Sequence, residues 1–77
     1  MTFEKISDGA IIKYDNGYTV KIKVEGRKLR LREELNGNPT TDTVFYLNED
    51  QAKQIKEALK KANNAEEVMQ LLQGVAK

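Results

Sequence analysis

Basic side chains that could bind phosphate are concentrated between Tyr18 and Arg32. Lysine and arginine neutralise phosphate groups, and an exposed aromatic ring nearby can stack on an unpaired base. Tyr46 is the candidate ring, and Glu25 is the one acid within the basic stretch. These residue types indicate binding of a single-stranded nucleic acid. The candidate phosphate ligands are Lys21, Lys23, Arg27, Lys28, Arg30 and Arg32.

The residue types on which most enzymes depend are missing. The 77 residues include no cysteine and no histidine, so the chain lacks thiol nucleophiles, thiolate zinc ligands and the usual base near neutral pH. Glu33 and Glu34 come nearest to a carboxylate pair, but neighbouring residues on a strand point to opposite faces. We therefore predict that the protein is not an enzyme and that it holds no metal and no cofactor.

Length and composition predict one small domain covering residues 1–77. A chain of this size has a small core, and dimerisation would add to its stability. No apolar run is long enough to span a bilayer, and the start of the chain does not resemble a secretion signal. A soluble, intracellular protein of the cytoplasm is expected. The net charge is only +1, so any attraction for nucleic acid must come from the local basic stretch.

The first half of the chain has the alternating pattern of strands. Apolar and polar residues alternate within Tyr18–Val24 and within Lys28–Leu35. These two runs and Ile11–Tyr14 are predicted strands, with glycine-containing turns between them. Residues 36–42 read as a loop by composition, and Thr43–Leu47 reads as a fourth strand. The sheet is thus predicted as a four-stranded antiparallel meander over residues 10–47. Residues 1–9 either add an edge strand or stay loosely attached.

Two helices are predicted after the sheet, over residues 48–62 and 64–75. Asn48 with Gln51 has the spacing of a capping box, and Asn64 with Glu67 repeats it. The first helix carries a narrow apolar stripe that could lie on the sheet or on a partner helix. A homodimer through this stripe is one expectation, with the interface formed by Ala52, Ile55 and Leu59.

Alternation along the strands predicts which side chains share a face of the sheet. Val20, Ile22 and Val24 should face the helices, and the lysines between them should face the other way. By the same rule, Lys28, Arg30 and Arg32 join the basic face, and Tyr46 points outward onto it. The sequence therefore predicts a cationic sheet face with one exposed ring.

Three stretches together resemble the positive cofactor four family of single-stranded-DNA-binding transcriptional coactivators, including its bacterial and phage relatives. They are Tyr18–Arg27, Leu29–Glu33 and Phe45–Glu57, within a likeness over roughly residues 10–72. The resemblance implies four antiparallel strands with a helix, homodimers formed through the helices, and DNA binding along the sheet in transcription. It assigns phosphate contacts to Arg27, Arg32 and Lys23. The chain has Val24-Glu25 and Leu35 where the family has stacking aromatic residues.

Two other interpretations of the basic face stay open at this point. A small regulator or inhibitor could use the same cations to bind an acidic surface of another protein. Alternatively, the cations are ordinary solvated side chains that protect the sheet from aggregation, and the domain only dimerises.

Overall fold

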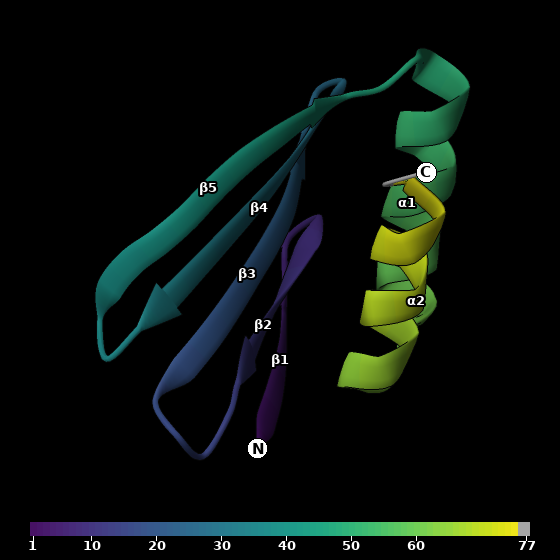
Figure 1. The fold of residues 1–77 in the computed structure, drawn as a ribbon. Helices are drawn as coiled ribbons and strands as arrows, with labels where there is room; N and C mark the ends of the chain where they lie inside the picture. Colours follow the sequence, from purple (N-terminus) through teal and green to yellow (C-terminus); the bar gives the residue numbers. More distant parts are fainter. Residues whose placement is uncertain (76–77) are drawn as a thin grey trace.

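The computed structural model describes residues 1–75 as one antiparallel sheet of five strands followed by two helices (Figure 1). Each strand pairs with its neighbour in the sequence, so every connection within the sheet is a hairpin. The predicted α+β meander with two C-terminal helices is confirmed, but the predicted number of four strands is wrong. The elements are β1 (Thr2–Ile6), β2 (Gly9–Lys13), β3 (Tyr18–Glu25), β4 (Lys28–Leu35), β5 (Asn38–Tyr46), α1 (Glu49–Lys61) and α2 (Ala65–Val75).

The additional strand is β1, which lies at one edge of the sheet. It pairs with β2 in a register that sets Phe3 opposite Ile12 and Ile6 opposite Gly9. Phe3 is half-buried and packs against the core, whereas Ile12 is fully buried. The first residues are therefore an edge strand anchored by Phe3, the first of the two possibilities that the sequence allowed.

The predicted loop over residues 36–42 is wrong, because most of it belongs to β5. Asn36 and Gly37 both adopt positive φ, of 52° and 85°, as the two central residues of a type I′ hairpin turn do. The chain reverses within these two residues, and β5 begins at Asn38. Pro39 is tolerated because β5 is an edge strand, and the pairing shifts register opposite Glu33 and Glu34. The strand ends at Tyr46, one residue before the predicted end.

The core lies between the sheet and the two helices. Val20, Ile22 and Val24 on β3 are each at most 2% exposed, as the alternation predicts. The helices lie side by side along one face of the sheet, where α1 packs on β2, β3 and α2, while the β4–β5 turn projects away from them (Figure 1). The opposite face has no covering layer within residues 1–75, and we call it the open face.

Both helices begin with the predicted caps. In α1 the Gln51 backbone N–H donates to Asn48 Oδ1 at 2.8 Å, and the Asn48 N–H donates to Gln51 Oε1 at 3.0 Å. Before α2, the Glu67 N–H donates to Asn64 Oδ1 at 2.9 Å. These bonds satisfy backbone donors that the helix leaves unpaired. Neither helix, over residues 1–75, has the length and apolar character needed to cross a membrane.

The apolar stripe of α1 faces the chain's own sheet. Ala52, Ile55 and Leu59 are only 5%, 7% and 2% exposed, and all three belong to the single core. A dimer that used these side chains would have to open that core. Their assignment to a dimer interface is therefore corrected, because the sheet and α2 already cover this stripe.

Candidate nucleic-acid interface

The strand register arranges the side chains of the open face in rows that cross the sheet. Paired residues of neighbouring antiparallel strands lie side by side and point to the same face. We number the rows from the Gly26 end. Row 1 is Glu25, Lys28 and Tyr46; row 2 is Ile6, Gly9, Lys23, Arg30 and Val44; row 3 is Glu4, Ile11, Lys21, Arg32 and Asp42.

The rows contain most of the predicted phosphate ligands. Lys28 lies in row 1, and rows 2 and 3 each carry two more of these cations. Arg27 lies beside them in the turn between β3 and β4, where Gly26 adopts a φ of +59° that suits a two-residue hairpin. The six predicted phosphate ligands thus lie close together, in the three rows and the adjoining turn.

Tyr46 occupies the end of row 1, at the open edge of the sheet. This residue is 78% exposed, the most of the large apolar or aromatic residues exposed within residues 1–75. Lys28 Nζ lies 5.7 Å from the ring centroid, close enough for a cation–π contact. The strand alternation that sends Phe45 and Leu47 to the core leaves this ring free to stack.

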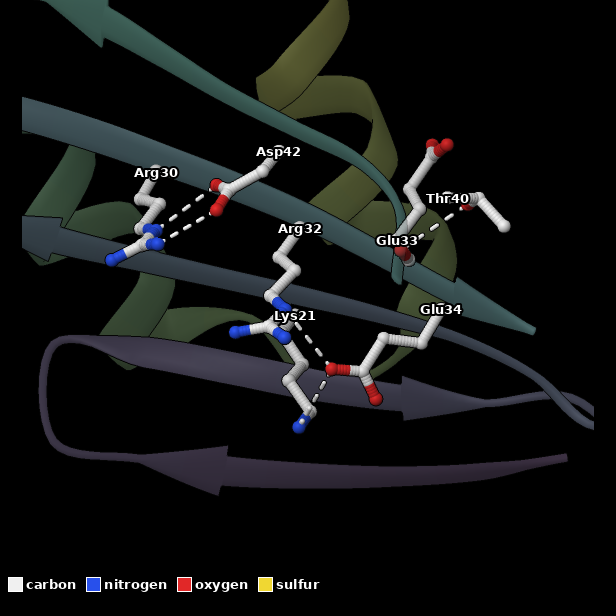
Figure 2. Close-up of polar contacts among 7 residues, drawn as sticks. All are labelled: Lys21, Arg30, Arg32, Glu33, Glu34, Thr40 and Asp42. Carbon is white, nitrogen blue, oxygen red and sulfur yellow. Dashed lines mark hydrogen bonds and ion pairs between the residues drawn. The ribbon is translucent and has the colours of Figure 1, made fainter. Parts of the chain in front are cut away.

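Arg30 is held by an acid of the same face. Its Nε and Nη2 donate to Asp42 Oδ1 and Oδ2 at 3.0 and 2.7 Å, in a two-pronged pair (Figure 2). These hydrogen bonds raise the pKa of Arg30 and lower the pKa of Asp42. A phosphate that approaches Arg30 must therefore compete with a well-aligned carboxylate.

Glu34 forms the second acidic partner on this face. Its Oε2 lies 3.1 Å from Arg32 Nε and 3.4 Å from Lys21 Nζ, between the two cations (Figure 2). The Glu34 side chain is only 13% exposed, so solvent screens this cluster less than an ordinary surface pair. The Arg32 Nε nitrogen is buried and makes no hydrogen bond within the described residues, so its contact with Glu34 is an ion pair only.

The open face therefore carries more negative charge than the sequence suggested. Glu25 was expected as the single acid among the cations, but Glu34 and Asp42 also lie among them. The composition of residues 36–42 predicts a loop, which gives Asp42 no place on the sheet. Glu34 has the same strand parity as Arg30 and Arg32, and alternation alone could have placed it.

Glu33 lies on the opposite face, as expected for the neighbour of Glu34, and Figure 2 shows the two side chains leaving β4 in opposite directions. Its Oε2 accepts a hydrogen bond from Thr41 Oγ1 at 2.8 Å. Burial, together with a hydrogen bond to Glu33, raises the pKa of Tyr18. The tilted rings of Tyr14 and Tyr18 lie 5.7 Å apart, a separation at which aromatic rings pack against each other. The two glutamates therefore lie on opposite faces of the sheet.

Two shallow grooves lie on the open face, each of about 180 Å³. Glu25 and Arg30 line both grooves and separate them. The tyrosine groove is lined by Glu25, Lys28, Arg30, Val44 and Tyr46. The aliphatic groove is lined by Ile6, Ile11, Lys21, Ile22, Lys23, Glu25, Arg30 and Arg32.

The described part of the chain contains no cluster of three or more acidic side chains that could hold a metal ion. No family model matches the chain, and neither a curated protein nor a solved structure matches it. The likeness to the positive cofactor four family thus depends on the three sequence stretches alone, and the fold differs from the one that this likeness implies by a fifth strand and a second helix.

Proposed function

We propose that the protein binds single-stranded nucleic acid, without sequence preference, along the open face of its sheet. The observation that carries the proposal is Tyr46, which is 78% exposed and whose ring lies within a cation–π distance of Lys28 at the end of row 1. Stacking of a base on an aromatic ring is tolerant of sequence because every base has a π face. The same contact is closed to a duplex, whose bases are already stacked.

The cations near the Gly26 turn supply the phosphate contacts in this proposal. Lys23, Arg27 and Lys28 form no ion pair within residues 1–75, so they can meet phosphate without displacing a carboxylate. Lys21, Arg30 and Arg32 are paired with Glu34 or Asp42 and contribute less. Three phosphate contacts to a single strand predict a slope of log K against log salt of about −2, and six contacts predict about −4.

The test is fluorescence anisotropy with a labelled single strand of about twenty nucleotides and with its duplex, since such a strand exceeds the site of one small domain. Each is titrated with the protein at several salt concentrations between about 50 and 200 mM. We expect tighter binding of the single strand and a slope nearer −2 than −4. Equal affinity for both forms, or no binding at the lowest salt, would overturn the proposal.

Tyr46→Ala tests the stacking contact directly. Loss of one stacked base costs about 1–3 kcal/mol, which corresponds to roughly 5- to 150-fold weaker binding of the single strand. Tyr46→Phe keeps the ring and is the matched control, with an affinity close to that of the unaltered protein. The salt slope should stay the same in both variants, because no cation is changed. A Tyr46→Ala variant with unaltered affinity would contradict the assigned role of the ring.

A second candidate function is that of a small regulator which binds an acidic surface of another protein. It is favoured by the ion pairs of Arg30 and Arg32, because mixed charges beside an exposed aliphatic side chain such as Val44, 40% exposed, suit a protein partner. Under this alternative, neither nucleic-acid form binds at low salt. Homodimerisation is a separate proposal, which ultracentrifugation tests.

A further inference from the structure

The aliphatic groove lies where row 2 lacks a side chain. Gly9 stands between Ile6 on β1 and Lys23 on β3, so row 2 has no side chain between these two residues. Ile22 also lines the groove, although this core residue is only 1% exposed. A Cβ atom at residue 9 would collide with the Ile22 carbonyl oxygen, so β2 and β3 approach closely here because residue 9 is glycine.

The groove combines an apolar interior with a cationic rim. Ile6, 37% exposed, and the half-buried Ile11 contribute aliphatic surface. Four cations surround them, with Glu25 as the only acid among the lining residues. The ligand class that fits is flat and apolar with a nearby negative charge. An unpaired base attached to its phosphate has both properties, whereas a bare phosphate chain would use only the rim.

The aliphatic groove adjoins the tyrosine groove across Glu25 and Arg30, which line both. A strand laid across the face from Tyr46 towards β1 would therefore pass directly from one groove to the other. Lys23 of row 2 lines the aliphatic groove and forms no ion pair within residues 1–75, so a phosphate of the strand would contact this lysine on the way. The two grooves thus offer consecutive sites to one extended ligand.

We infer that the aliphatic groove is a second base-binding site, in which Ile6 and Ile11 pack against one unpaired base of a strand whose phosphate lies at Lys23. This inference rests on the proposed function and adds a binding site to it. In this site, the aliphatic side chains contact the face of the base, as a second aromatic ring would do by stacking. Removing the base contact should reduce affinity only for strands that carry bases.

The test compares a thymine homopolymer of about twenty nucleotides with an abasic strand of the same length, at one fixed salt concentration. The variants are Ile6→Thr and Ile11→Thr, which keep a β-branched side chain suited to a strand but remove aliphatic surface. The control is Leu35→Thr, since Leu35 is also an exposed aliphatic residue, at 44%, but pairs with Tyr18 on the other face. Melting temperatures of all variants establish that each is folded.

We expect the thymine strand to bind more tightly than the abasic strand. Ile6→Thr and Ile11→Thr should each weaken thymine-strand binding about fivefold, as loss of part of a buried aliphatic contact does, and leave abasic binding unchanged. Leu35→Thr should change neither. If both strands bind and the isoleucine variants do not alter their ratio, the inferred base site is wrong although the proposed function stands. If neither strand binds, the proposed function fails and the base site fails with it.

Discussion

The two ends of the open face both carry lysine and arginine, but within the described residues these cations are unpaired at one end and held in ion pairs at the other. Near the Gly26 turn, Lys23, Arg27 and Lys28 form no ion pair within residues 1–75. Farther along the strands, Arg32 and Lys21 share Glu34. The number of basic residues on a surface is therefore a poor measure of its capacity to bind phosphate. Available charge depends on which acids the register brings alongside.

This difference directs the proposed contacts to one end of the sheet. The unpaired cations adjoin Tyr46, so electrostatic attraction and stacking can act on the same short stretch of ligand. The paired end is closer to neutral and is held by contacts within the chain. We accordingly expect substitutions at the turn end to weaken binding, and removal of acids at the paired end to strengthen it.

The largest effect among the charge substitutions is expected from Lys23→Gln combined with Lys28→Gln. Loss of two phosphate contacts should lower the magnitude of the salt slope by about 1.4 and weaken single-strand binding at low salt by about tenfold or more. The measurement is the anisotropy titration of the labelled single strand over the same range of salt.

The matched control for this variant removes an entire ion pair. Arg30→Gln with Asp42→Asn deletes one positive and one negative charge, so it also has two substitutions but leaves the net charge of the face unaltered. We expect its salt slope to match that of the unaltered protein. Similar losses in the two double variants would show that Arg30 contacts phosphate despite its partner, and the comparison between the two ends would then fail.

Glu34→Gln should have the opposite sign and a smaller size. Because one carboxylate neutralises both Lys21 and Arg32, its removal makes two cations available and should increase the magnitude of the salt slope by up to about 1.4. Glu33→Gln is the control, since the same change in charge then occurs on the helix-facing side of β4. Weaker single-strand binding in the Glu34→Gln variant would indicate that the carboxylate orients the two cations for phosphate.

Much of this arrangement could be predicted from the sequence, because alternation fixes the face of each strand residue. The inward direction of Val20, Ile22 and Val24 and the outward direction of Tyr46 follow from position alone, and the structure agrees. The helix starts were equally accessible, since Asn48 with Gln51 is a local pattern whose hydrogen bonds do not depend on the rest of the fold.

What the sequence analysis missed concerns turns and partners distant in the chain. Asn36-Gly37 is a strong hairpin signal, but the polar residues and the proline that follow it favour a loop, so the local pattern does not place Asp42 on a strand. The pair between Arg30 and Asp42 depends on the register across that turn. Burial of the α1 stripe likewise depends on α2 and β1, whose contribution to the core no local pattern states.

The smallest expected effect concerns the ion pair between Arg30 and Asp42, which lies between the two ends of the open face. A change of pH tests what this pair contributes to stability. The hydrogen bonds from Arg30 lower the pKa of Asp42 in the folded chain, so the pair contributes stability above the ordinary pKa of an aspartate. That contribution is lost as the pH falls below about 4 and the carboxyl group becomes protonated.

Asp42→Asn has no group to protonate, so its urea midpoint should fall less between pH 7 and acid than that of the unaltered protein. Arg30→Gln keeps the carboxylate but removes the donor, and it should show the same weaker pH dependence. If all three proteins lose stability equally on acidification, the pair contributes nothing to folding, and Arg30 is then as available to phosphate as the cations beside the Gly26 turn.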